Sequence, residues 1–250
     1  MSSPPVAIPA ATLIVIRDRI GQPPDLLMVE RARTMAFAGG ALVFPGGRID
    51  PGDEALAALL DAGDDGAARV AAIRETIEEA GIAIGLEPPP SPSQIALLRR
   101  RLHAGDSLAV ALDGTGLRLA LDQLHAFTRW VPAHRHTRIF DTRFFLARAT
   151  DAEHASVDHT ENVRLLWAGA AQLLADAAAG AATIIFPTRR VLERLAGLAS
   201  FADALADARR YPPVTITPYV EQRRGVPHLC IPEGVGYPVT SEPLSATDRG

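Results

Sequence analysis

The residues from Phe44 to Ile82 constrain this chain more than any other part of its sequence. A glycine turn, Phe44-Pro45-Gly46-Gly47, precedes a helical segment that ends in Arg74-Glu75-Thr76-Ile77-Glu78-Glu79-Ala80-Gly81. At about 100° per residue, the three glutamates of this helix share an arc of roughly 100°. Apolar residues occupy the opposite side: Val70, Ile73, Ile77 and Ala80. One face of the helix is therefore expected to pack on a core, while the other presents carboxylates.

Three carboxylates this close together repel one another, which predicts that a cation lies among them. Carboxylates without Cys or His partners suit hard divalent cations such as Mg²⁺ or Mn²⁺, which commonly bridge to substrate phosphates. Arg74 lies one turn before Glu78 and can orient a carboxylate with its planar fork of donors. The alternative is an ordinary solvated helix face held by salt bridges. The upstream glycine turn and the apolar opposite face favour a metal site for phosphate chemistry.

The same residues resemble the signature of the Nudix hydrolases, G-x5-E-x7-R-E-U-x-E-E-x-G-U, where U is a bulky aliphatic residue. The chain matches it at Gly47, Arg74, Glu75, Glu78, Glu79, Gly81 and Ile82, while Thr76 stands at an aliphatic position. Asp53 replaces the first Glu of the signature, and Glu54 stands beside it. Twenty residues separate Asp53 from Arg74 where the signature has seven, which predicts an insertion of 13 residues. Its Ala/Leu-rich part, Ala55 to Asp65, is expected to form an extra helical turn or two and a loop.

The resemblance implies hydrolysis of a phosphoanhydride in a nucleoside diphosphate linked to another group. It implies Mg²⁺ or Mn²⁺ as the cofactor and a small-molecule nucleotide diphosphate as the partner. The implied metal ligands are Glu75, Glu78, Glu79 and the backbone of Gly47, and the implied catalytic residues are Arg74, Glu75, Glu78 and Glu161. Gly46 and Asp53 are expected to support the loop. Asp158 and His159 compete with Glu161 as the base, and an exposed strand end is the alternative for Glu161.

The long segment before Arg74, together with the Phe140 to Phe145 stretch, resembles the branch that contains coenzyme A diphosphatases. Half of that branch's upstream pattern is present, including Arg31 and Phe44, but Ala32 and Ala36 replace its Ser and its second Arg. We predict substrate binding by Arg31, Arg143 and Phe44, with Arg143 facing either a diphosphate or a neighbouring acidic side chain. Coenzyme A or an acyl derivative is the leading substrate, with ADP-ribose, a dinucleotide or a nucleotide sugar as alternatives. A nucleotide-metabolite sensor without turnover is a different class of function, against which the intact set of glutamates argues.

Composition excludes several other classes of protein. The formal net charge of −4 indicates no basic surface for nucleic acid. The sequence contains no run of about 18 apolar residues, which a membrane-spanning helix would need. The single cysteine, Cys230, excludes an internal disulfide and fits a reducing cytosol. The first ten residues lack the basic start of a secretory signal. We therefore expect a cytoplasmic enzyme, and a homodimer stays open.

The predicted fold is α/β (α+β), with a Nudix-type mixed β-sheet sandwiched between helices. Residues 9–210 are expected to form a single domain, with an inserted helical cap at about 88–127 after the proline-rich break. Aliphatic runs predict four strands, and helical spacing predicts three further helices. The strands are 11–16, 26–29, 138–147 and 163–167, and the helices are 95–102, 117–127 and 187–210. Residues 211–250, rich in proline, are expected to form an extended C-terminal tail.

Overall fold

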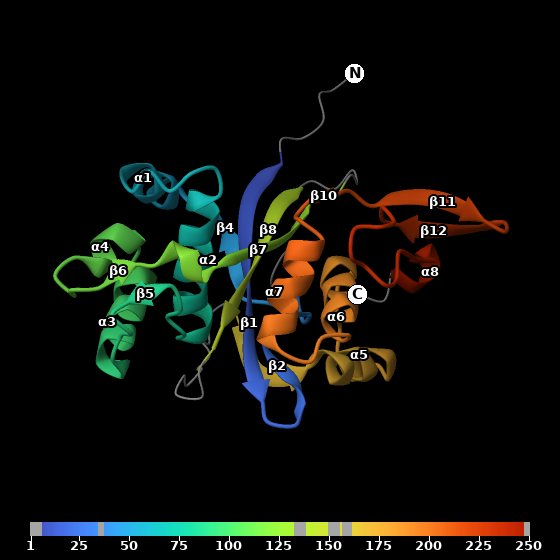
Figure 1. The fold of residues 1–250 in the computed structure, drawn as a ribbon, viewed down its shortest axis with the longest axis horizontal. Coiled ribbons are helices and arrows are strands. Elements are labelled where there is room, and N and C mark those ends of the chain that lie inside the picture. Colours follow the sequence, from blue (N-terminus) through green and yellow to red (C-terminus); the bar gives the residue numbers. More distant parts are fainter. Residues whose placement is uncertain (1–6, 35–37, 133–138, 150–155, 157–161, 248–250) are drawn as a thin grey trace, which may run out of the picture.

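In the computed structural model, the described residues are 7–34, 38–132, 139–149, 156 and 162–247. They form a mixed sheet with a layer of helices on each face (Figure 1). Strands β1 (Ile8–Arg19) and β2 (Gln22–Arg31) run antiparallel, whereas β8 (Phe140–Arg148) lies parallel to β1 on its other side. The predicted mixed sheet between helices is therefore confirmed.

Eight strands of the described residues belong to this sheet, in the order β10-β7-β8-β1-β2-β3, with β4 added to β1 and β9 added to β2. The remaining strands of the sheet are β3 (Leu42–Val43), β4 (Gly46–Arg48), β7 (His125–Trp130), β9 (Asn162–Gly169) and β10 (Thr215–Ile216). Strand β1 is buried on both faces because consecutive apolar side chains point to opposite sides of the sheet. Leu13 and Val15 belong to one core cluster, and Ile14 and Ile16 belong to the other.

Helices α1 to α4 cover the first face, and α5 to α7 cover the second (Figure 1). The first group is α1 (Pro51–Leu59), α2 (Gly66–Ala80), α3 (Pro92–His103) and α4 (Leu108–Leu112). The second is α5 (Ala170–Ala178), α6 (Phe186–Leu195) and α7 (Phe201–Arg210). Helix α2 carries the glutamates, and its apolar residues Val70, Ile73, Ile77 and Ala80 are completely buried in the first cluster. It ends at Gly81, whose φ of 64° is left-handed, as glycine permits.

The expected helical cap is only partly helical. Helix α3 matches the expected helix at 95–102, but the segment 117–127 is not a helix. It contains β6 (Arg118–Leu119), paired with β5 (Leu86–Glu87), then the 3-10 turn Leu121–Gln123 and the start of β7. Gly114 and Gly116 have positive φ values of 72° and 74°, which turn the chain just before it. The apolar residues Leu117, Leu119 and Leu121 are two apart, and this spacing also suits extended chain.

The expected helix at 187–210 is two helices, α6 and α7. The break lies at 196–200, where Ser200 caps α7 by accepting a hydrogen bond from the backbone N–H of Asp203 at 3.1 Å. Serine at this position stabilises a new helix start more than it stabilises a helix interior. Among the helices of the described segments, none has the length and apolar character needed to cross a membrane.

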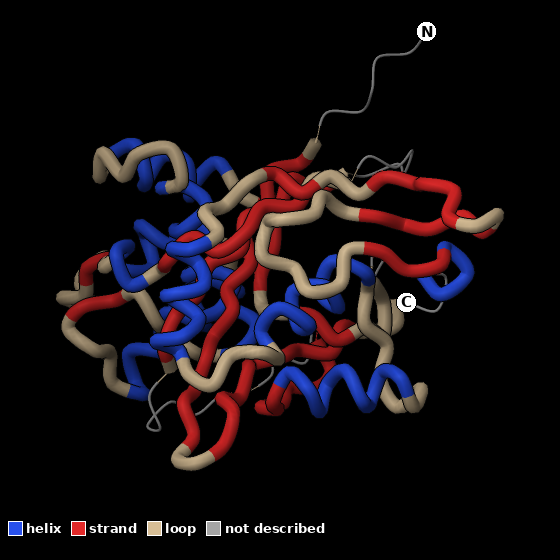
Figure 2. Tube along the Cα trace, turned by 45° about the vertical axis from the view of Figure 1, so that its right-hand side comes forward, coloured by secondary structure: helices blue, strands red, loops and turns tan. Residues whose placement is uncertain are grey.

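The C-terminal residues are more ordered than an extended tail. They form a separate three-stranded sheet, visible in Figures 1 and 2, and a short helix. These elements are β11 (Tyr219–Arg223), β12 (Val226–Cys230), β13 (Ser241–Pro243) and α8 (Leu244–Thr247). The Tyr237 hydroxyl lies 2.8 Å from the Thr128 hydroxyl and accepts from Trp130 Nε1 at 2.9 Å. Because Tyr237 is buried against β7, this segment belongs to the second core cluster.

Candidate active site

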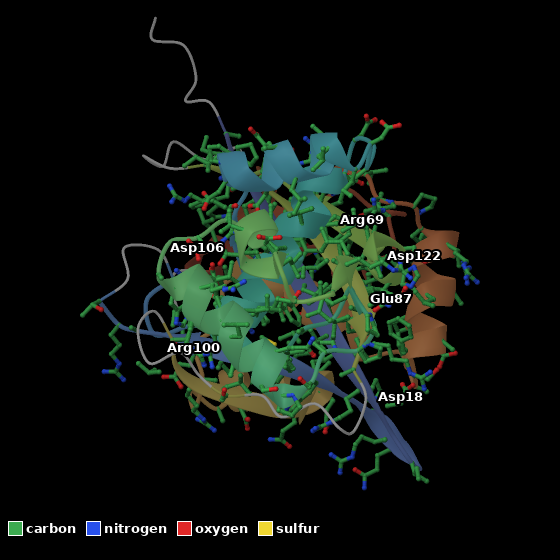
Figure 3. All side chains as sticks on the ribbon, turned by 90° about the vertical axis from the view of Figure 1, so that its left-hand side faces the viewer. Asp18, Arg69, Glu87, Arg100, Asp106 and Asp122 are labelled. Atoms are coloured by element: carbon green, nitrogen blue, oxygen red, sulfur yellow. The ribbon has the colours of Figure 1, made fainter. Side chains whose placement is uncertain are left out.

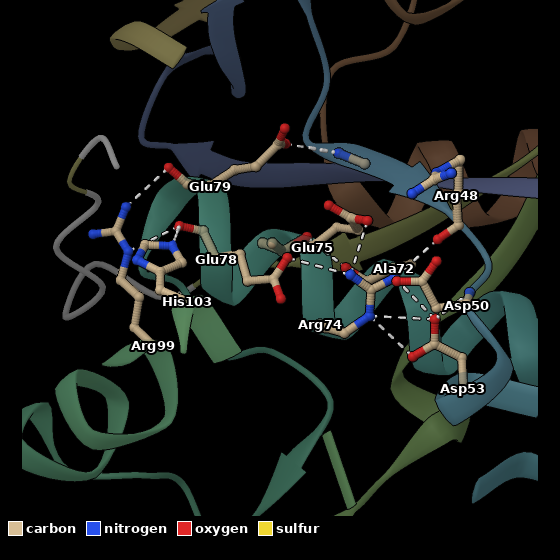
Figure 4. Close-up of polar contacts among 12 residues, drawn as sticks. Arg48, Asp50, Asp53, Ala72, Arg74, Glu75, Glu78, Glu79, Arg99 and His103 are labelled. Carbon is tan, nitrogen blue, oxygen red and sulfur yellow. Dashed lines mark hydrogen bonds and ion pairs between the residues drawn. The ribbon is translucent and has the colours of Figure 1, made fainter. Parts of the chain in front are cut away.

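The glycine turn and the C-terminal half of α2 lie against each other (Figure 4). The backbone N–H of Gly46 donates to Glu79 Oε2 at 2.9 Å. A Cβ on Gly47 would overlap the carboxylate of Glu75. A side chain at position 47 would therefore displace the Glu75 carboxylate from its place beside β4.

Arg74 lies at the centre of the cluster and is only 7% exposed. Its Nη1 donates to Glu75 Oε1 at 2.9 Å and to Glu78 Oε2 at 3.2 Å. Its Nη2 donates to the carbonyl of Arg48 at 2.8 Å, which joins α2 to β4. One planar guanidinium thus orients two neighbouring carboxylates and fixes the strand opposite them.

Asp53 supports the cluster from behind. It is 1% exposed and accepts from Arg74 Nε at 3.0 Å and from Nη2 at 2.9 Å. It also accepts from the backbone N–H of Asp50 at 2.9 Å, in a capping box at the start of α1. Glu54, its neighbour, is exposed. The short acidic side chain at position 53 therefore braces both the loop and Arg74.

Burial and repulsion act on the carboxylates in the same direction. Burial raises the pKa of Glu75 to about 8, although the nearby Arg74 opposes this shift. Burial also raises the pKa of Glu78. For Arg74, burial lowers the pKa, but the hydrogen bond to Asp53 and the surrounding carboxylates outweigh it and raise the pKa. A cation that binds at Glu75 therefore competes with the proton that burial favours there.

The donor set fits a hard divalent cation in its chemistry. It consists of Glu75, Glu78 and Glu79 next to a glycine backbone, without sulfur or imidazole ligands, which suits Mg²⁺ or Mn²⁺. Across the described residues, however, no three His, Cys, Asp or Glu side chains are arranged as a metal site. Arg74 and the Gly46 N–H hold the three carboxylates instead. The residues can hold a metal, and the metal itself stays a prediction.

The other residues predicted for the site lie in different places. Phe44 does not face the carboxylates: it is 3% exposed in the second core cluster, on the opposite face of the sheet. Arg31 ends β2, and its buried Nε has no hydrogen-bond partner among the described residues. Arg143 donates from Nε to Asp65 Oδ1 at 2.9 Å, so in this structure it faces the acidic side chain that was one of its two alternatives. Glu161, Asp158 and His159 lie outside the described residues.

Two residues of α3 that sequence reasoning missed contact the end of α2 (Figure 4). Arg99 donates from Nε to the carbonyl of Glu78 at 2.9 Å and from Nη2 to the carbonyl of Glu79 at 3.1 Å. His103 Nε2 lies 3.1 Å from the same Glu78 carbonyl. These contacts satisfy carbonyls that a helix end leaves without partners. The only signal in the sequence was the basic run at 99–101, and such a run does not indicate which groups its side chains contact.

We expect Arg99→Ala to lower metal affinity and kcat by about tenfold each, with a smaller change in KM. Without Arg99 the last turn of α2, which carries Glu78 and Glu79, loses two bonds and frays. Outer contacts that orient metal ligands typically contribute 10- to 100-fold. Isothermal titration with Mn²⁺ and steady-state kinetics measure both effects. Arg100→Ala is the control, because Arg100 is exposed on α3 (Figure 3), and equal effects in the two variants would contradict a positioning role for Arg99.

Comparisons with known proteins identify the family. No family model matches the chain. The Caenorhabditis elegans protein named "Putative nudix hydrolase 7" is 27% identical over 173 residues, which cover 68% of this chain and 55% of that protein, so the match spans about half of the relative's length. A crystal structure of a Nudix hydrolase from Alicyclobacillus acidocaldarius is 31% identical, with a TM-score of 0.70, and the alignment covers 80% of this chain and 96% of that one. With the Arg74-centred cluster beside Gly46 and Gly47, this similarity over nearly the whole of a solved relative shows that the chain belongs to the Nudix hydrolase family.

Proposed function

We propose that this Nudix hydrolase uses Mg²⁺ or Mn²⁺ to cleave the phosphoanhydride of a nucleoside diphosphate linked to another group, most favourably coenzyme A or an acyl-coenzyme A. The observation that carries the proposal is the arrangement of three glutamates of α2 around Arg74 and against the glycine turn. Such a set offsets the negative charge of a diphosphate only with a cation bound. A binding module without turnover has no need for it.

Each residue has a distinct part in this proposal. Glu75, Glu78 and Glu79 would hold the metal, which when bound neutralises phosphate oxygens and lowers the pKa of the attacking water. Arg74 keeps Glu75 and Glu78 directed toward the same point, and Asp53 keeps Arg74 in place. Glu161 stays a candidate base. The C-terminal half of α2 would thus hold the metal, while the glycine turn packs closely against its carboxylates.

Arg31 supports an anionic substrate. Leu27 and Arg31 are four residues apart on β2, so their side chains share a face of the strand, and Leu27 belongs to the core cluster under α2. The Nε atom of Arg31 is buried without a hydrogen-bond partner within the described part of the chain. A buried donor without a partner is costly, and a phosphate oxygen would satisfy it.

A panel of substrates tests the proposal. Coenzyme A, ADP-ribose, a dinucleotide and a nucleotide sugar are compared at equal concentration with Mg²⁺ and with EDTA, and the products are separated by chromatography. We expect coenzyme A to be split fastest, into adenosine bisphosphate and phosphopantetheine, and only with the metal. Binding of these compounds with no metal-dependent turnover would favour the sensor. A coenzyme A rate below every other rate would overturn the substrate but not the hydrolase.

On the best substrate, Arg31→Ala is expected to raise KM by about tenfold, since a hydrogen bond to a charged group contributes about 1.5–3 kcal/mol. Arg31→Lys should recover only part of the loss, because a lysine lacks the planar fork. Arg33→Ala is the matched comparison, since Arg33 is exposed two residues away from Arg31 and lies close to Ala36, which replaces the second Arg of the coenzyme A diphosphatase pattern. An unchanged KM in Arg31→Ala, with a raised KM in Arg33→Ala, would transfer the role to Arg33.

A further inference from the structure

A row of paired residues crosses the sheet from the glycine turn to its far edge. Gly47 of β4 pairs with Ala11 of β1, which pairs on its other side with Arg143 of β8. Arg143 pairs with Arg129 of β7, and Arg129 pairs with Thr215 of β10. Directly paired residues point to the same face of a sheet. At about 4.8 Å per strand, Arg143 lies roughly 10 Å from Gly47 along this row, and Thr215 lies roughly 19 Å away.

A cavity lies over the far end of this row. Its volume is about 150 Å³, and its lining includes Asp65, Thr128, Arg129, Arg143, Phe145 and Thr215. The face of the row is the face that α2 covers, because Ala11 and Phe145 belong to the core cluster under α2. Thr215 and its neighbour Pro213 are exposed. The cavity and the carboxylate cluster are therefore on the same face of one sheet, two to four strands apart.

The two arginines of the cavity differ in how many of their N–H donors are already hydrogen-bonded. Arg129 gives Nε and Nη2 to the two oxygens of Asp141, at 2.7 and 2.5 Å. Arg143 gives only Nε, to Asp65, and its two Nη atoms make no further hydrogen bond among the described residues. Asp65 precedes α2 but does not cap it with its side chain. The Nη donors of Arg143 thus remain available at the cavity.

The Asp65–Arg143 pair does not close the cavity to an anion. The Asp65 side chain is 38% exposed and that of Arg143 is 22% exposed. Partial exposure to water weakens this ion pair, so another anion can compete with the Asp65 carboxylate for Arg143. A phosphate oxygen pair matches the fork of an arginine better than a single carboxylate oxygen does.

We propose that this cavity is a second anion subsite, in which Arg143 binds a phosphomonoester on the ribose that also carries the phosphoanhydride of the substrate. The inference rests on the proposed function and narrows its substrate class. Coenzyme A has such a group on its ribose, whereas dephospho-coenzyme A and ADP-ribose lack it. In coenzyme A the phosphomonoester is on the 3′ oxygen of the ribose whose 5′ oxygen carries the phosphoanhydride, so it selects the substrate without taking part in cleavage.

Equilibrium binding to the metal-free protein tests the subsite without any turnover. In EDTA, isothermal titration compares adenosine 3′,5′-bisphosphate with adenosine 5′-monophosphate. The wild type is expected to bind the bisphosphate at least about tenfold more tightly, and Arg143→Gln is expected to bind both nucleotides equally. Arg148→Gln is the matched control: Arg148 is on the same strand, points to the other face and also pairs with one aspartate, Asp18. It should keep the wild-type preference.

Arg143→Lys provides a second variant, which keeps the charge without the fork and should keep only part of the preference. Equal binding of both nucleotides by the wild type would overturn the subsite, as would an unchanged preference in Arg143→Gln.

Hydrolysis of coenzyme A and of dephospho-coenzyme A separates the proposed subsite from the proposed hydrolysis. Equal Mg²⁺-dependent kcat/KM for both compounds removes the subsite and leaves the hydrolase. A bisphosphate preference in a protein that cleaves no nucleotide removes the proposed hydrolysis and leaves the subsite.

Discussion

Replacing Glu78 or Glu79 by Gln is expected to lower kcat on a nucleotide substrate by at least about 100-fold while the chain stays folded. Removing one strong electrostatic contribution from an active site typically costs 10²- to 10³-fold. Glutamine keeps an oxygen that can accept from Arg74 at position 78 or from the Gly46 N–H at position 79, so the local hydrogen bonds survive. Steady-state kinetics at saturating Mg²⁺, together with circular dichroism, measure activity and folding.

The stability of Glu78→Gln has an expected pH dependence. Burial raises the pKa of Glu78 above its ordinary value of 4.5. The folded chain therefore binds this proton more tightly than the unfolded chain does, and the resulting stability is complete below pH 4.5 and is lost as pH rises through the folded pKa. Glutamine carries no such loss. The melting temperature of metal-free Glu78→Gln should equal that of the wild type near pH 4.5 and exceed it at higher pH.

Glu54→Gln is the control for both measurements, because Glu54 is exposed beside the brace residue Asp53. It should leave activity and melting unchanged. Full activity in both Glu78→Gln and Glu79→Gln would remove the carboxylate cluster from the reaction. A loss in Glu54→Gln as large as theirs would mean that Glu54, rather than Asp53, takes the place of the signature acid.

The carboxylate face of α2 could be predicted because its determinants are local. Helical periodicity alone places Glu75, Glu78 and Glu79 opposite the buried Ile73 and Ile77. Gly81 ends the helix because it adopts a left-handed backbone conformation, and this too is a property of a single residue. The contact of Arg74 with both Glu75 and Glu78 follows from the same spacing.

Long-range contacts could not be predicted in this way. Arg143 and Asp65 are 78 residues apart, and only the register of β8 against β1 brings them together. Phe44 follows the apolar Leu42 and Val43, and whether its ring faces α2 or the opposite layer depends on strand register, because successive side chains alternate. Its burial in the second cluster is therefore a property of the sheet and not of the glycine motif.

The C-terminal segment illustrates a different limit. Its prolines predict extended chain, and β11, β12 and β13 are indeed extended, but they pair with one another. Tyr237 then fills a space beside Trp130 and Thr128 that is formed by residues more than 100 positions earlier. Composition indicates the backbone conformation of such a segment, while its docking site depends on a core that only the folded sheet creates.

The largest loss of stability is expected for Arg74→Ala. This change leaves Asp53, which is 1% exposed, as a buried carboxylate without its main partner. Breaking a buried ion pair from one side typically costs about 3–5 kcal/mol in the free energy of unfolding. Urea denaturation at pH 7 in EDTA measures this cost. Arg118→Ala is the comparison: the Arg118 side chain is 73% exposed in its pair with Glu87, and its loss should cost no more than about 1 kcal/mol.

Combining Arg74→Ala with Asp53→Asn separates stability from catalysis. The neutral amide is less costly to bury without an arginine, so the double variant should regain at least about 1 kcal/mol of the loss. Its activity should stay at the level of Arg74→Ala, because Glu75 and Glu78 still lack the donor that directs them toward one point. Activity that returned together with stability would show that Arg74 acts only through folding. Wild-type stability in Arg74→Ala would contradict the buried Asp53–Arg74 pair itself, since no other donor in the described structure reaches both oxygens of that carboxylate.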